Sequence, residues 1–144
     1  MARFKDQGVV AAAFQPYLEP GEQLRHVAFG VKQPNILLII GLTALAILPG
    51  VIAVAMLTRE FVVGLTDRRF IVLRFKGSKL VVQEVIEYPL SPLPPAKTST
   101  GGLFTHIQVL DPARPFVAKF HRMGMPGNRE NAMAIGAALT GAPA

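Results

Sequence analysis

The chain has no cysteine, few histidines and an excess of basic over acidic residues. Without cysteine it can form neither a disulfide framework nor a cysteine-ligated metal site, so redox chemistry gives no indication of the compartment. The three histidines, His26, His106 and His121, lack a partner at metal-ligand spacing, and we expect no metal site. No signal peptide is evident, because the apolar run begins too late and lacks a small-residue cleavage site.

Patterns that accompany catalysis are also missing from the sequence. Glu84 and Glu87 lie on opposite faces of one expected strand, so they do not form a catalytic pair. No serine occupies a Gly-x-Ser-x-Gly turn, and no glycine-rich phosphate loop follows a strand. These absences predict a non-catalytic protein without a cofactor.

A basic strand with interleaved aromatic residues at 69–75 superficially resembles an RNA-binding strand. It lacks the internal glycines of such strands, and Ile71, Leu73 and Phe75 are spaced to form one core face. We therefore expect no nucleic-acid partner.

An uncharged apolar run occupies residues 35–58. As one straight helix it would be about 36 Å long, enough for a hydrocarbon core of about 30 Å. It is too evenly apolar for a surface helix, which would carry a polar stripe. The alternative is a buried hairpin in a water-soluble core, but so short a chain has little with which to cover one. We therefore expect insertion into a membrane.

Pro49 and Gly50 interrupt this run. Proline removes a backbone donor and glycine permits conformations closed to other residues, so the pair indicates either a kinked spanning helix or the membrane turn of a re-entrant hairpin. Basic residues on both flanks favour the hairpin, because both ends would then lie on the cytoplasmic side.

In the rest of the chain, apolar and polar residues alternate in short runs separated by Gly, Pro and Asp turns, a pattern that predicts antiparallel strands. A helix is expected at 1–18, either near a membrane surface or packed on the domain. Strands are expected at 23–33, 60–66, 69–76, 79–88, 103–110 and 115–121, with a proline-rich loop and one edge strand at 89–102. A final helix is expected at 128–139, capped by Asn128 and ended by Gly141.

Basic residues are concentrated just after the apolar run. Residues 59–79 hold six basic and two acidic side chains, a net of +4 out of the formal +6 of the chain. Such a cluster is typical of the cytoplasmic side of a membrane, where each charge near an anionic leaflet contributes about 1 kcal/mol. The candidate residues for binding anionic lipid or a partner are Arg59, Arg68, Arg69, Lys76 and Lys79. Ordinary solvated turns are the competing interpretation.

Two short motifs and the final helix resemble the bacterial pleckstrin-homology-like (PH-like) domains. The motifs are Leu-Glu-Pro-Gly-Glu at 18–22 and Gly-Leu-Thr-Asp-Arg-Arg-Phe at 64–70, and the resemblance covers most of residues 17–140. It implies a seven-stranded, strongly bent barrel closed by the last helix, with a role in binding or assembly. Members are often fused to membrane segments, but here the apolar run interrupts the domain between its first two strands.

The expected fold class is therefore α+β: a strongly bent antiparallel PH-like barrel or sandwich closed by a C-terminal helix. An apolar membrane hairpin at 35–58 is inserted in a domain at 21–140, which follows a helix and turn at 1–20. The expected function is a membrane-anchored module that binds anionic lipid or protein at the cytoplasmic face of the cell membrane. An accessory subunit of a larger integral membrane complex is the alternative, and a homo-oligomer is also open.

Overall fold

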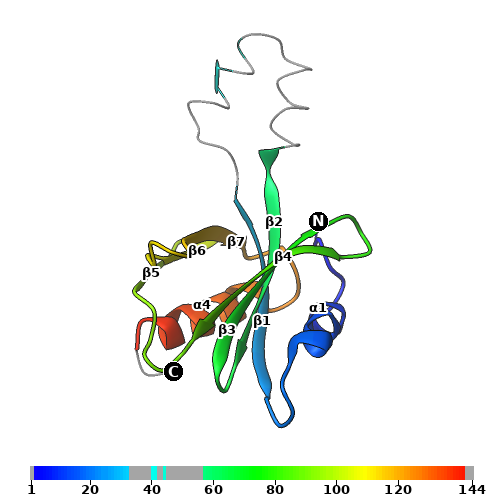
Figure 1. Ribbon diagram of the computed structural model, residues 1–144. Coiled ribbons are helices and arrows are strands. Elements are labelled where there is room, and N and C mark those ends of the chain that lie inside the picture. Colours follow the sequence, from blue (N-terminus) through cyan, green and yellow to red (C-terminus); the bar gives the residue numbers. More distant parts are fainter. Residues whose placement is uncertain (1, 33–39, 42–43, 45–56, 142–144) are drawn as a thin grey trace.

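In the computed structural model, which describes residues 2–32, 40–41, 44 and 57–141, seven strands form one antiparallel sheet. A short helix α1 (Gln7–Phe14) and a 3-10 turn η1 (Gln15–Tyr17) precede the sheet. The strands are β1 (Leu24–Lys32), β2 (Arg59–Thr66), β3 (Arg69–Lys76), β4 (Val81–Pro89), β5 (Ala96–Thr100), β6 (Phe104–Val109) and β7 (Phe116–His121). Helix α4 (Asn128–Leu139) comes last (Figure 1).

The sheet order is β4-β3-β2-β1-β7-β6-β5. The β2–β3–β4 meander and the β6–β7 hairpin are confirmed, because alternation and tight turns specify them locally. Phe70 of β3 contacts Phe116 of β7 at 6.0 Å between ring centroids, although two strands separate them in the sheet. The sheet therefore bends back on itself.

Each face of the β1–β4 half has its own core. On the concave face, α4 buries Ala132, Ile135 and Leu139 against the sheet. On the opposite face, Val10 and Phe14 of α1 are fully buried against the other side of the strands. Figure 1 shows α4 and α1 on opposite sides of β1. The helix at the N-terminus thus packs on the sheet.

We correct the membrane part of the predicted fold class. No helix in the described residues is long and apolar enough to cross a membrane. A crossing requires a helix of about 20 predominantly apolar residues, whereas the described helices α1 and α4 have 8 and 12 residues. The rest of the predicted insert, including its membrane turn at Pro49 and Gly50, lies outside the described residues. Lys32 and Arg59 are paired on adjacent strands, so the chain leaves and re-enters the sheet at the same place.

Two local predictions also need correction. Asn128 does not cap α4: the cap is Gly127, with a φ of 73°, and the Asn128 side chain instead bonds the backbone of Phe29 and His121. In β4, the alternation of the sequence predicts one face for Val82 and Ile86, but an irregularity of register between Arg74 and Phe75 separates them. Such a bulge moves Val82 to the face covered by α1, while Ile86 stays with the other core.

Candidate functional site

Four exposed cations gather where the chain leaves and re-enters the sheet. Lys32 ends β1 and lies opposite Arg59, the first residue of β2. Antiparallel pairing brings the end of β3 to the same place, so Lys76 and the following turn with Lys79 lie beside them. We call Lys32, Arg59, Lys76 and Lys79 the basic end.

No carboxylate lies within ion-pair distance of these four side chains in the part of the chain that the structure describes. Neighbouring arginines are different: Arg3 pairs with Glu60 at 2.7 Å, and Arg74 lies 3.7 Å from Glu84. The carboxylates near this end are thus engaged by other cations. An anion approaching the basic end has no internal competitor for these charges.

Two cavities open at the basic end and share Arg59. The larger, about 770 Å³, lies between β4 and the β6–β7 hairpin, and Lys32, Arg59, Glu84, Glu87 and Arg114 supply its charged groups. The smaller, about 470 Å³, is lined by Arg59, Arg74 and Lys76 together with the exposed Leu57. Both volumes fall in the range of small-molecule sites.

Arg68 and Arg69 do not belong to the basic end. They lie at the β2–β3 turn, at the other end of eight-residue strands and hence about 23 Å away. Arg68 is half-exposed and lies 3.6 Å from Glu19. The five residues predicted to bind an anion are therefore split between two ends of the sheet.

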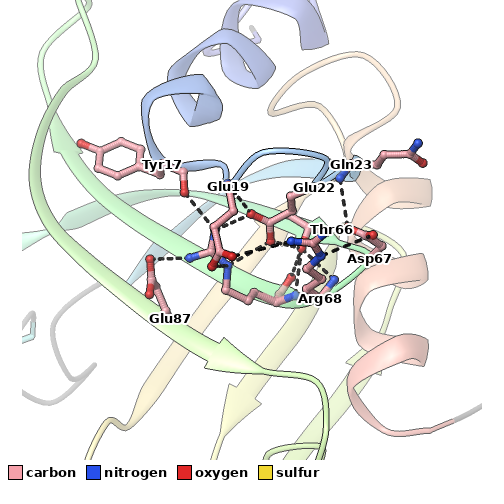
Figure 2. Close-up of polar contacts among 9 residues, drawn as sticks. Tyr17, Glu19, Glu22, Gln23, Thr66, Asp67, Arg68 and Glu87 are labelled. Carbon is pink, nitrogen blue, oxygen red and sulfur yellow. Dashed lines mark hydrogen bonds and ion pairs between the residues drawn. The ribbon is translucent and has the colours of Figure 1, made fainter.

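Arg69 lies at the centre of a partly buried polar network, whose partners Tyr17, Glu22 and Glu87 are labelled in Figure 2. Its guanidinium donates to both carboxylate oxygens of Glu22, at 2.5 and 2.9 Å, to Glu87 at 2.8 Å and to the Tyr17 carbonyl at 2.9 Å. The Thr66 hydroxyl donates to Glu22 at 2.7 Å. We call Tyr17, Glu22, Thr66, Arg69 and Glu87 the Arg69 network.

The charges of this network stabilise one another. Hydrogen bonding from Arg69 is the main cause that lowers the pKa of Glu22 to about 2, although burial opposes it. The same bond raises the pKa of Arg69 above its already high value. With the Glu22 side chain fully buried and Arg69 only 14% exposed, this arginine is committed to the fold. It cannot also serve an external anion.

The histidines and acidic residues form no metal site among the described residues. His26 bonds Asn131 at 3.2 Å, and the His121 ring accepts from the Met123 amide at 3.0 Å. Glu84 and Glu87 each pair with an arginine instead of with one another. These contacts give His26, His121, Glu84 and Glu87 structural partners.

Lys32 is the residue of the basic end that the sequence-based set omitted. It precedes the apolar run, far from the basic cluster in sequence, and joins it only through the β1–β2 pairing. Pairing the strand at 23–33 with the strand at 60–66 would have identified it.

Comparisons with known proteins do not assign a family. No family model and no curated protein matches the chain. Among solved structures it is similar to the hSac2 domain from human phosphoinositide phosphatase Sac2, with a TM-score of 0.49 and 9% identity over 92% of this chain and 78% of that one. A likeness of this strength carries no inference about function.

Proposed function

We propose that this chain is a non-catalytic binding module of the PH-like type that recognises anionic lipid through its basic end. The observation that carries the proposal is the set of four exposed cations without a carboxylate partner among the described residues. Each such charge near an anionic leaflet contributes about 1 kcal/mol, which is enough for four to hold a small domain at a surface. The proposed location is the cytoplasmic face of the cell membrane, and a membrane-spanning helix is not required.

Contacts between the two PH-like motifs support the proposed family. Glu22 ends the first motif, and Thr66 and Arg69 belong to the second. Their side chains meet in the Arg69 network, so the motifs form one structural unit. A seven-stranded antiparallel sheet followed by a packed helix is also the architecture that the resemblance implies.

Sedimentation with lipid vesicles tests the function. The full chain is mixed with phosphatidylglycerol-containing vesicles and with neutral phosphatidylcholine vesicles. We expect binding to the anionic vesicles only, and a variant with Lys32, Arg59, Lys76 and Lys79 replaced by Gln should bind at least about a hundredfold more weakly.

A matched variant controls for net charge. Lys5, Lys97, Arg122 and Arg129 are exposed and lie outside the basic end, so their replacement by Gln removes the same charge elsewhere. This control should bind anionic vesicles within about threefold of the wild type. Equal losses in the two variants would show attraction by net charge alone and would refute a site at the basic end.

A further inference from the structure

Strand β4 has an unpaired edge beside the larger cavity. Among the described strands it is the outermost of the sheet, and its one partner there is β3. Its residues Val85 and Glu87 line the cavity of about 770 Å³, and Gln108 and Val117 of the β6–β7 hairpin line it too. The cavity is thus a groove with a free strand edge along one side.

The hydrogen-bond pattern identifies which backbone groups face the groove. Leu90 N–H donates to the Arg68 carbonyl at 3.1 Å, which places residues 68 and 90 in a hydrogen-bonded pair. Because such pairs alternate along antiparallel strands, Tyr88 and Ile86 also bond to β3. Val85 and Glu87 therefore direct their amides and carbonyls toward the free edge.

Side chains cover this edge at both ends. The Arg114 guanidinium donates to the Glu87 carbonyl at 2.6 Å and lies over the Tyr88 ring, while the Gln83 amide donates to the Val81 carbonyl at 3.2 Å. Between them, the outward amide and carbonyl of Val85 have no partner in the described part of the chain. An edge open over so short a distance suits a short extended segment better than the long strand pairing of a second copy.

The charges of the groove select an acidic occupant. Glu84 lies 3.7 Å from Arg74, and Glu87 lies 2.8 Å from Arg69, so each lining carboxylate has a cation beside it. Lys32 and Arg59 remain without an acidic partner in the described chain. The exposed Val85 and Val117 add apolar surface at the rim.

We propose that this groove binds a short, extended, acidic peptide of a partner protein, which adds a strand to β4 at Val85. Val85 lies opposite Leu73 and shares its face, so the peptide residue opposite Val85 is apolar. The residues on either side of it point to the other face of the sheet, where Lys32 and Arg59 line the cavity, and are acidic. The recognised pattern is acidic-apolar-acidic, with affinity from main-chain bonds and specificity from the alternating side chains.

The test uses a fluorescein-labelled peptide of sequence Thr-Glu-Val-Glu-Thr, measured by fluorescence anisotropy against the full chain. We expect saturable binding that weakens at least about tenfold when both Glu are changed to Gln. Val85→Pro removes the outward amide without touching the bonds to β3, and should also weaken binding about tenfold. Val85→Thr keeps the amide and is the matched control, with binding within about twofold of the wild type.

Amide mapping by NMR of the wild-type chain gives a readout that does not depend on a variant folding. Peptide-induced shifts should centre on Val85 and Glu87. Shifts centred elsewhere, or equal affinity for the Glu and Gln peptides, would overturn the proposal. A concentration-dependent dimer that Val85→Pro abolishes would overturn it in favour of self-association. Vesicle binding should be unchanged in Val85→Pro, which separates this groove from the lipid proposal.

Discussion

The Arg69 network and the basic end each contain an arginine, at opposite ends of β2 and β3, but these cations differ in burial and in their partners. Arg69 is nearly buried and makes bonds to two carboxylates and a carbonyl. Lys76 and Lys79 are exposed and have no carboxylate at ion-pair distance in the described residues. The difference teaches that partner availability, and not the density of basic residues, decides which cations can bind a ligand.

The largest expected effect comes from breaking the Arg69 network. Arg69→Ala leaves the fully buried Glu22 carboxylate without its cation, and should lower the free energy of unfolding by about 3–5 kcal/mol. Urea denaturation followed by circular dichroism measures this change. The neighbouring Arg68→Ala is the control, because its exposed pair should cost less than about 1 kcal/mol. Equal costs for the two arginines would contradict the assigned roles.

The second-largest expected effect is a loss of folding stability in acid, through the same network. The pKa of Glu22 is lowered from its ordinary 4.5 to about 2, chiefly by the bond from Arg69. A carboxyl group with a lowered pKa in the folded state stabilises the fold above pH 4.5 and loses that contribution as the pH falls toward 2. The loss amounts to about 3 kcal/mol.

Denaturation curves recorded from about pH 6 down to about pH 2 measure this loss. Glu22→Gln should remove this part of the pH dependence, at the cost of lower stability at neutral pH. Lys76→Gln at the basic end should leave the slope intact. A Glu22→Gln chain with the wild-type slope would show that another carboxyl group controls acid unfolding.

How much of this could be predicted from the sequence depends on whether the signal is local. The meander over 60–88 and the helix at 128–139 follow from alternation, turns and periodicity within a few residues. The role of Arg69 could not be predicted that way, because its partner Glu22 is 47 residues distant in sequence. Without that partner, Arg69 could not be distinguished from Lys76.

Non-local effects also explain the other corrections. Asn128 has the residue type of a helix cap, but its side chain bonds the backbone of Phe29, which is 99 residues away. The bulge in β4 places Val82 on the opposite face of the sheet from the one that alternation predicts, and no turn residue in the sequence marks the bulge. The membrane hairpin predicted at 35–58 was inferred from mean hydropathy and length, and no described helix is long and apolar enough to cross a membrane.

Two glycines, one near each end of β2 and β3, extend the comparison to smaller changes in stability. At Gly64, near the Arg69 network, an added Cβ would lie 2.9 Å from side-chain carbons of both Leu24 and Phe14. Gly64→Ala should therefore lower the free energy of unfolding by about 1–3 kcal/mol through overpacking.

At Gly77, near the basic end, nothing lies within 4 Å of an added Cβ, but φ is +79°. Gly77→Ala should cost about 1 kcal/mol through backbone strain alone, and Gly77→Asn less. Thermal melts distinguish the two, and equal sensitivity to Asn and Ala at Gly77 would contradict the strain account.

The smallest effect on folding belongs to single charges of the basic end. Lys79→Gln should change the free energy of unfolding by less than about 0.5 kcal/mol, because the side chain is exposed and unpaired in the described structure. It should nevertheless reduce partitioning onto anionic vesicles about fivefold, the equivalent of about 1 kcal/mol.

High salt tests whether this loss is electrostatic. Raising the salt to about 1 M shortens the screening length to about 3 Å and should erase the difference in vesicle binding between Lys79→Gln and the wild type. The loss of stability in Arg69→Ala should persist at the same salt, since buried pairs are screened much less. A Lys79→Gln defect that survives high salt would mean that Lys79 acts through packing, and the distinction drawn between the two ends would then fail.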